Sequence, residues 1–318
     1  MLDSKMGYRV GEFAANHMGG IKKSLRVVLD VAHLGHVTLG SKMMSSICRG
    51  MNKMGLPLWT TAMPKKKKQP KPGSHVGKAE TEDLKVVYFP SCINQTMGLS
   101  KEAPVEHPLV DEVCHLLNKA GYEVIFPENM HKMCCGQIWE SKGMLDIADR
   151  KSGELEEALW KASEHGRYPV LCAQSPCLHR MRKTISKMKL YEPAEFIMTY
   201  LKDRLDFHPI DRHIALHLTC STREMGVAND LIALAHLCSN NVYLPEGVGC
   251  CGFAGDRGFT YPEMNKYALR KLKPQIEEHH IEVGYSNSRT CEIGLQTNTG
   301  IPYMSIVYLV NECTTRKK

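Results

Sequence analysis

The sequence of 318 residues contains no apolar run that approaches the roughly 20 residues needed to span a bilayer as a helix. Its first residues also do not lead into an uninterrupted apolar segment with a small-residue cleavage site, so no signal peptide is predicted. From these two absences we expect a cytoplasmic protein without a transmembrane segment.

Common catalytic motifs are missing as well. There is no P-loop, no nucleophile elbow and no acid–base pair that can be named. The glycines at 252, 255 and 258 lack the G-x-G turn directly after a strand that marks a dinucleotide site. His217 is interpreted as a core histidine on a strand, and His279-His280 as a cation at a helix end. No catalytic residue is therefore predicted.

The net charge of +7 is modest, and part of it lies in the run Lys65-Lys66-Lys67-Lys68, which is flanked by prolines. We interpret this run as a solvated linker. No basic helix and no interleaved aromatic residues accompany it, so no nucleic-acid partner is expected. A weak attraction to an anionic membrane surface, at the inner face of the membrane, is the alternative that the sequence leaves open.

Cysteine is abundant, with 13 residues, an odd number in a chain without an export signal. In a reducing compartment, clustered cysteines indicate metal binding or catalysis more than disulfides. Eight of them occur in one order that is repeated: a single cysteine, an adjacent pair followed by glycine, and another single cysteine. The first cysteine set is Cys92, Cys134, Cys135 and Cys177; the second cysteine set is Cys220, Cys250, Cys251 and Cys291. The other five are interpreted as small buried hydrophobic residues.

Adjacent cysteines are poorly placed to form a disulfide with each other, but both can point at one compact metal centre. Four thiolates are the ligand count of a 4Fe-4S cluster and of tetrahedral zinc. Structural zinc usually draws its ligands from short-spaced knuckles, whereas these cysteines lie far apart in the chain. The pattern therefore favours a 4Fe-4S cluster at one or both cysteine sets, and zinc at one of them remains the alternative.

A cluster held by four thiolates is negatively charged, so nearby cations would stabilise it and raise its potential. Arg257 follows the second cysteine pair and Arg289 precedes Cys291, and both are predicted to contact the cofactor. Arg223 and Lys132 are weaker candidates for the same role, and Lys132 is the one most readily explained as surface charge.

Strands alternate with helices around both cysteine sets, which predicts parallel sheets joined by crossover helices. The cysteines follow the carboxyl ends of strands, where open α/β sheets bind ligands. We therefore predict an α/β fold with two tandem, duplicated Rossmann-like units. The predicted strands are 85–90, 122–126, 168–172, 213–218, 241–245, 281–285 and 304–309, and the predicted helices are 107–120, 143–165, 193–205, 229–237 and 262–279.

Two further segments precede these units. Residues 1–60 are predicted to be helical, with Ile21, Leu25, Val28, Leu29 and Ala32 as a packing stripe and a second short helix around Met43, Met44 and Ile47. They are expected to pack on the remaining chain or on a partner. Residues 61–84 form the Lys/Pro linker, 85–206 the first unit and 207–318 the second.

The segments Pro245–Phe259 and Ser286–Gly294 carry a resemblance to the cysteine-rich (CCG) domain family. They are most similar to the C-terminal iron–sulfur region of FAD-linked D-lactate and D-2-hydroxyglutarate dehydrogenases. The Leu56–Trp59 stretch resembles the connection that follows the ferredoxin module in those enzymes. The cysteine-rich subunit of heterodisulfide reductase and the glycolate oxidase iron–sulfur subunit are more distant members. The resemblance implies an electron-transfer module of a flavin-dependent D-2-hydroxy acid dehydrogenase, with FAD and a ferredoxin domain on a partner.

The sequence departs from heterodisulfide reductase at two positions. Gln174 and Ser288 stand where that family has the first cysteine of a C-x-x-C pair. This difference favours four-cysteine sites over a five-cysteine cluster that reduces disulfides. A thiol/disulfide redox enzyme and a zinc-stabilised domain that docks a flavin subunit are the two alternative functions.

Overall fold

The fold is built on two parallel sheets, seen in a computed structural model that describes residues 4–52, 59–67 and 70–317. Lys68 and residues 56–58 of the Leu56–Trp59 stretch lie outside the described residues. The first sheet has the order β1 (His75–Val76), β3 (Glu123–Ile125), β2 (Lys85–Tyr88), β4 (Val170–Leu171), β5 (Leu190–Tyr191), and the second β10 (Tyr303–Ser305), β9 (Val283–Ser286), β7 (Ile210–Leu216), β8 (Ser239–Tyr243).

Both sheets have the same topology. Among the strands of these two sheets only β1 is antiparallel. Without β1, the first sheet reads β3-β2-β4-β5 and the second reads β8-β7-β9-β10, so the second strand of each unit along the chain lies at one edge, followed by the first, third and fourth. The predicted α/β class with duplicated parallel units is confirmed, because the repeat found in the cysteines is also a repeat of strand order. A separate antiparallel ribbon joins β6 (Leu205–Phe207) to β11 (Thr314–Arg316).

Helices connect the strands of both units. The N-terminal segment contains α1 (Ser4–Asn16) and α2 (Met18–Asn52). The first unit contains α3 (Cys92–Thr96), α4 (Leu109–Lys119), η1 (Met130–Lys132), α5 (Gln137–Glu140), α6 (Leu145–Ala162), α7 (Ser175–Thr184), α8 (Pro193–Phe196), η2 (Ile197–Leu201) and η3 (Lys202–Arg204). The second contains α9 (Cys220–Glu224), α10 (Ala228–Cys238), η4 (Arg257–Phe259), α11 (Pro262–Ala268), α12 (Leu272–Glu278), α13 (Arg289–Thr299) and α14 (Ile306–Cys313). Within the described residues, no helix is long and apolar enough to cross a membrane.

The last predicted strand, 304–309, is wrong beyond Ser305. The Ser305 hydroxyl accepts a hydrogen bond from the Val307 amide and so caps α14, which begins at Ile306. The apolar run that suggested a strand is buried as a helix, because a short apolar run does not distinguish the two. The helix predicted over 262–279 is also interrupted, between α11 and α12.

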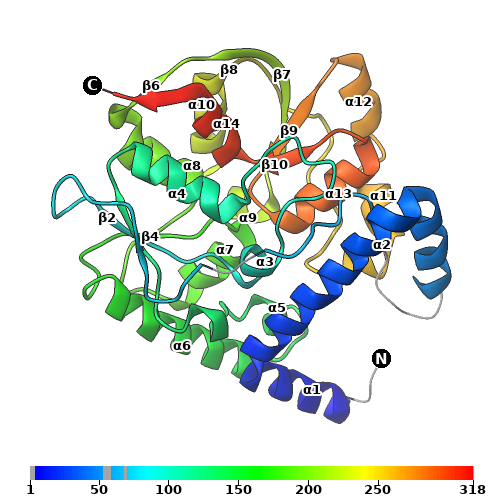
Figure 1. The fold of residues 1–318 in the computed structure, drawn as a ribbon, viewed down its shortest axis with the longest axis horizontal. Helices are drawn as coiled ribbons and strands as arrows, with labels where there is room; N and C mark the ends of the chain where they lie inside the picture. The colour runs from blue at the N-terminus through cyan, green and yellow to red at the C-terminus, as the bar shows by residue number, and fades with distance from the viewer. Residues whose placement is uncertain (1–3, 53–58, 68–69, 318) are drawn as a thin grey trace.

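The two sheets share one hydrophobic core. Buried residues of α4, α8, α10 and α14 form a single cluster with apolar residues of both sheets, and Figure 1 shows these four helices gathered together. The contacts are reciprocal. The last α-helix of the second unit, α14, packs on α4, and the last α-helix of the first unit, α8, packs on α10. The outer face of the first sheet is covered by α1, α6 and α7, and that of the second by α12 and α13.

The long helix α2 breaks at Gly40, whose φ of 76° lies outside the helical region, and this break produces the second short helix that was predicted. The predicted packing stripe is mostly exposed. Leu29 is buried, but Val28 is 61% exposed, while the charged Lys22 is only 2% exposed. The helix therefore presents a different face to the protein than its apolar pattern indicates.

Part of the predicted linker packs on the first unit. Lys67 is buried, and its Nζ lies 2.6 Å from Oδ1 of Asp111 at the start of α4. The backbone of Lys66 bridges to Met97, and β1 pairs with β3. The interpretation of the lysine run as solvated is therefore wrong for Lys67, whose charge is paired inside the protein.

Glu192 is a buried carboxyl group at the boundary of the two units. It caps α8 by accepting a hydrogen bond from the Ala194 amide, and Asn287 of the second unit donates its side-chain NH₂ to the other oxygen. Burial raises the pKa of Glu192 to about 7. The Asn287 Oδ1 atom has no hydrogen-bond partner among the described residues, so after rotation of its amide it can accept the proton of a neutral Glu192.

This raised pKa predicts a pH-dependent stability. A carboxyl group whose pKa is higher in the folded state binds its proton more tightly there, so stability falls as the pH rises from about 4.5 to about 7. The loss is about 1.4 kcal/mol per pH unit at most. Glu192→Gln is expected to remove this dependence, because glutamine has no proton to lose. Urea unfolding at several pH values measures it; parallel slopes in both proteins would contradict it.

Candidate metal centres

The first cysteine of each set opens a short helix in the same way. Cys92 begins α3 four residues after the end of β2, and Cys220 begins α9 four residues after the end of β7. A hydroxyl side chain precedes each: Ser91 caps α3 and Thr219 caps α9 by accepting backbone amide hydrogen bonds. These five-residue helices are too short for a periodicity to reveal them, so neither was predicted from the sequence.

The cysteine pairs are followed by glycines in the left-handed region, with φ of 87° at Gly136 and 72° at Gly252. A Cβ atom at Gly136 would collide with Ala148 of α6, and one at Gly252 with Ala268 of α11. The same two helices also hold the pairs in place: Ser152 of α6 donates a hydrogen bond to the Cys135 carbonyl, and Asn265 of α11 donates one to the Cys251 carbonyl. Close packing of a helix thus requires the glycine in both copies.

The last cysteine of each set is the third residue of a helix. Cys177 lies in the first turn of α7 and Cys291 in the first turn of α13. These cysteines were predicted to follow strands, but the helices that hold them were not predicted. The signal that was available is Pro176 in the first turn of α7, where a helix tolerates proline.

The structure brings the eight predicted cysteines together as two sets of four. Neighbouring thiols interact in series, from Cys92 through the pair to Cys177 and from Cys220 through the pair to Cys291. The Sγ atoms of Cys251 and Cys291 are 3.1 Å apart. Each set thus draws its four thiols from three segments that are distant in the chain.

The donor chemistry of both sets suits a metal centre bound by thiolates, because soft thiolates select zinc and iron–sulfur clusters. Among the residues that the structure describes, however, no group of three or more His, Cys, Asp or Glu side chains has the spacing to hold a metal ion. In the second set the 3.1 Å between Cys251 and Cys291 is too short, because tetrahedral zinc at about 2.3 Å from each sulfur keeps sulfur atoms roughly 3.8 Å apart. The thiols of Cys251 and Cys291 would have to separate to bind a metal.

Hydrogen bonds decide which thiol of the second set is the most acidic. The Cys220 thiol and the Gly252 amide donate to Cys250 Sγ, and these donors lower the pKa of Cys250. In the first set, donation to Cys135 together with burial raises the pKa of Cys134 to about 12. The negative charge of the apoprotein is therefore expected on Cys250.

The two sets differ in their exposure to solvent. Cys134, Cys135 and Cys177 of the first set are all buried. In the second set Cys220 and Cys250 are exposed, although Cys251 is buried. Cys92 is half-buried, so the first set is more enclosed than the second, which can be reached from outside through Cys220 and Cys250.

This difference predicts which cysteine an alkylating reagent modifies first. In metal-free protein Cys250 is both exposed and an activated thiolate, so iodoacetamide is expected to modify it at least about tenfold faster than Cys134. Mass spectrometry of tryptic peptides after short labelling measures both rates. Equal rates at the two positions would contradict the assigned difference in exposure and acidity.

Lys22 is a charged residue near the first set that was not predicted from the sequence. It extends from α2, and its Nζ donates to Gln95 Oε1 at 2.9 Å and to the carbonyls of Met130 and Met133. Burial lowers its pKa to about 8, and the charges of Cys92 and Cys134 act in the opposite direction. Lys22 and Arg26 lie at helical spacing from Leu29, but only the structure shows that Leu29 is buried.

Neither of the two arginines predicted to contact the cofactor donates a hydrogen bond to a thiol in the described part of the chain. Arg289 donates to Glu292 and to the Gly98 carbonyl. Arg257 is exposed, and it forms no ion pair in the described part of the chain. Arg223 donates to the Gly249 carbonyl, next to Cys250, at 3.2 Å. A direct role for Arg257 and Arg289 at a cofactor stays a prediction.

Gln174 and Ser288, the two positions at which a fifth cysteine is absent, contact each other. Gln174 donates to the Ser288 hydroxyl at 3.2 Å and accepts the Arg289 amide at 3.1 Å. Both side chains are buried at the junction of the two units. These positions join the units and contribute no thiol to either set.

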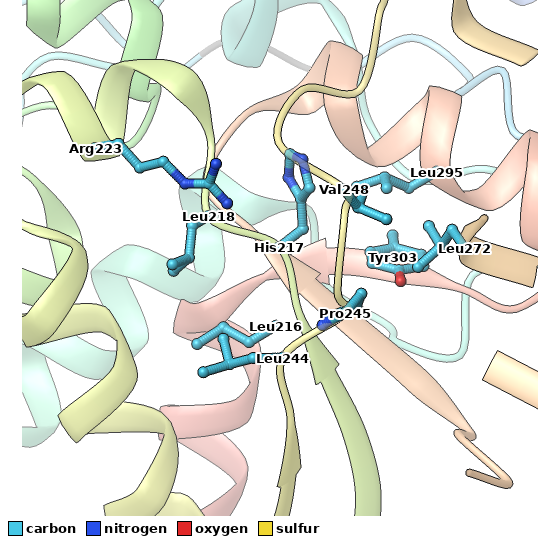
Figure 2. A pocket seen from close by; sticks show the side chains of 10 residues that line it. All are labelled: Leu216, His217, Leu218, Arg223, Leu244, Pro245, Val248, Leu272, Leu295 and Tyr303. Carbon is cyan, nitrogen blue, oxygen red and sulfur yellow. The ribbon is translucent and has the colours of Figure 1, made fainter. Parts of the chain in front are cut away.

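A cavity of about 90 Å³ lies beside the second set, lined mainly by apolar side chains together with His217 and Arg223 (Figure 2). His217 is buried, and its Nδ1 is 3.1 Å from the Ser286 hydroxyl. Its Nε2 has no hydrogen-bond partner within the described ranges. The interpretation as a core histidine therefore accounts for only one of its two nitrogens.

Comparison with known proteins shows the same duplication. The family described as "CCG: Cysteine-rich domain" matches twice, at residues 86–182 and 214–296, which together make up more than half of the chain. "Lactate utilization protein A 1" of Bacillus mycoides is 23% identical over 238 residues, covering 69% of this chain and 92% of that protein. "Lactate utilization protein A" of Oceanobacillus iheyensis is 25% identical over 190 residues, covering 52% and 73%.

Solved structures give weaker matches. The aspartate racemase of Picrophilus torridus has a TM-score of 0.33 and 11% identity, covering 74% of this chain and 91% of its own. The glutamate racemase of Aquifex pyrophilus has a TM-score of 0.32 and 11% identity, covering 72% and 81%.

Proposed function

Because the chain belongs to the cysteine-rich (CCG) domain family, we propose that it is an iron–sulfur electron-transfer protein of lactate utilisation. It would act as a subunit or module of a flavin-dependent D-2-hydroxy acid dehydrogenase of the D-lactate type. The two cysteine sets would each hold a 4Fe-4S cluster, which accepts and releases one electron at a time.

The observation that carries this proposal is that both cysteine sets are built in the same way. Each has a capped helix that begins at the first thiol, a glycine that lets a helix pack against the pair, and a last thiol in a helical first turn. Both sets consist of thiols alone. Cysteines that served only as buried core residues would not require the same left-handed glycine after the pair in both units.

We assign different roles to the two cysteine sets because they differ in their exposure to solvent. Three of the four thiols of the first set are buried, and this enclosure would protect a cluster from hydrolysis and from side reactions. The exposed Cys220 and Cys250 put the second set within reach of another protein. We therefore place the exchange of electrons with the partner at the second set.

The proposed partner carries FAD and oxidises the hydroxy acid. The helices α1 and α2 support a partner, because they expose an unusual number of large apolar residues for a monomer in water. These residues include Phe13, Val28, Val31 and Leu34, each more than half exposed. The proposed location is the cytoplasm, where D-lactate would be oxidised.

A thiol/disulfide redox enzyme is the second candidate function. The exposed Cys250 with its lowered pKa favours it, because an exposed thiolate is the nucleophile of such exchange. The contact between Gln174 and Ser288 weighs against the five-cysteine cluster of heterodisulfide reductases. Activity of the isolated chain on a heterodisulfide would favour this candidate.

Metal analysis after anaerobic purification tests the proposal. We expect iron and acid-labile sulfide in equal amounts, and visible absorbance that dithionite bleaches. A protein with neither iron nor bleachable absorbance would overturn the proposal. Zinc near two equivalents per chain, without iron, would instead identify a zinc-stabilised docking domain.

A further inference from the structure

The N-terminal helix α2 places a buried lysine against the first cysteine set. Lys22 is 2% exposed, which is unusual for a lysine. All three hydrogen bonds of its ammonium group go to uncharged acceptors: the Gln95 side chain and the carbonyls of Met130 and Met133. Met133 immediately precedes the cysteine pair, and Gln95 lies in the helix that Cys92 begins.

No carboxylate among the described residues compensates this charge. In the part of the chain that the structure describes, Lys22 forms no ion pair, whereas the neighbouring buried Lys151 is paired with Glu154. Arg26 and Lys151 add positive charge near Lys22, and the nearby groups that would carry negative charge, once deprotonated, are the thiols of Cys92 and Cys134. An unpaired buried cation is strongly unfavourable, so its natural counter-charge is a thiolate or a group that thiolates bind.

We propose that Lys22 is the counter-charge of the metal centre at the first cysteine set, supplied by a helix that precedes both CCG units. This inference rests on the proposed function, because it takes the centre to be an iron–sulfur cluster with net negative charge. A fixed positive charge stabilises the reduced form more than the oxidised form, because reduction adds an electron, and so raises the midpoint potential. The second set has no equivalent among the described residues, since its nearby Arg223 is exposed.

Four variants test the role of this charge. Lys22→Met removes the charge and keeps the length, Lys22→Gln keeps a hydrogen-bond donor without charge, and Lys22→Arg keeps the charge. Lys119→Met is the matched control, because Lys119 also donates to uncharged acceptors, at Asn311 and Thr314, but lies in α4. The variants are made in the full chain and also with Cys251→Ala, which leaves the first set as the sole complete set of four.

Iron and sulfide content are measured after anaerobic reconstitution, and midpoint potentials by redox titration followed by electron paramagnetic resonance. We expect a negative shift of one of two potentials in Lys22→Met and Lys22→Gln, and the same shift in the Cys251→Ala background. Lys22→Arg and Lys119→Met are expected to keep the wild-type values. Loss of the first centre in both uncharged variants, with its retention in Lys22→Arg and a wild-type circular dichroism spectrum, supports the same conclusion.

The outcomes separate this inference from the proposed function. A wild-type chain that binds no iron overturns both. A wild-type chain with two centres whose potentials do not change in Lys22→Met or Lys22→Gln overturns the inference and leaves the proposed function standing. A potential that shifts equally in Lys119→Met also overturns it, because the effect would then not depend on charge at the first set. If Lys22→Met does not fold, Lys22→Gln decides.

Discussion

Replacing Cys251 by alanine is expected to remove about half of the iron bound by the chain, roughly four of eight atoms if both sets hold a 4Fe-4S cluster. Cys251 is the innermost thiol of the second set: it is 4% exposed and contacts both Cys250 and Cys291. A set of three thiols cannot complete the usual coordination, whereas the first set contains none of these residues. Iron and sulfide analysis of anaerobically reconstituted protein measures the loss.

The control for this prediction is Cys114→Ala. Cys114 is also buried, but it lies in α4, within the core between the two sheets. This change is expected to lower stability by about 1 kcal/mol through the small cavity that it leaves, and to keep all of the iron. Retention of full iron in Cys251→Ala would show that the second set is not a ligand set. Equal losses in both variants would indicate unfolding as the cause.

Replacing Gly252 by alanine is expected to destabilise the protein by about 2–5 kcal/mol and to disrupt the second set. Two costs combine: a left-handed backbone costs an L-residue about 1–2 kcal/mol, and overpacking adds about 1–3 kcal/mol. The added Cβ would lie 2.6 Å from Ala268 Cβ and 2.7 Å from the Met264 carbonyl oxygen. Helix α11 would have to move away from the cysteine pair. Urea unfolding measures the loss of stability, and iron analysis the loss of the site.

A substitution at Gly255, three residues further on, separates the backbone cost from the overpacking cost. Its φ of 75° is nearly the same as the 72° of Gly252, but no described atom lies within 4 Å of a Cβ atom placed there. Gly255→Ala should therefore incur the backbone cost alone, about 1 kcal/mol, and keep its iron. Similar losses in the two variants would mean that close packing of α11 does not hold the cysteine pair in position.

The duplicated units could be predicted because their signals are periodic and repeated. Strands such as Lys85–Tyr88 and Ile210–Leu216 end shortly before a cysteine in both copies, so the position of each set at the carboxyl ends of the strands followed from the order of elements. The helices that begin at Cys92 and Cys220 were missed because five residues are too few to show a helical period. The strand predicted over 304–309 failed beyond Ser305, where a hydroxyl cap decides the conformation.

Lys22 could not be predicted, for a different reason. The apolar stripe of a helix ordinarily faces the protein, and α2 does not follow this rule: Val28 faces solvent and Lys22 is buried. The burial of Lys22 in place of an apolar residue is explained by the neighbouring thiols, which lie in parts of the chain that are 70 or more residues away. A contact of that kind depends on tertiary structure and leaves no local signal.

The reciprocal packing of α14 on α4 and of α8 on α10 has the form of a symmetric dimer interface, in which each half covers the same surface of the other. The chain is in effect a homodimer whose protomers have become covalently joined. In a true homodimer any change in one copy appears in both, so the two centres must stay identical. Joining the copies removes this constraint. One cysteine set can then be covered by a preceding helix and its lysine while the other stays open to solvent, so that two equivalent sites become different from each other.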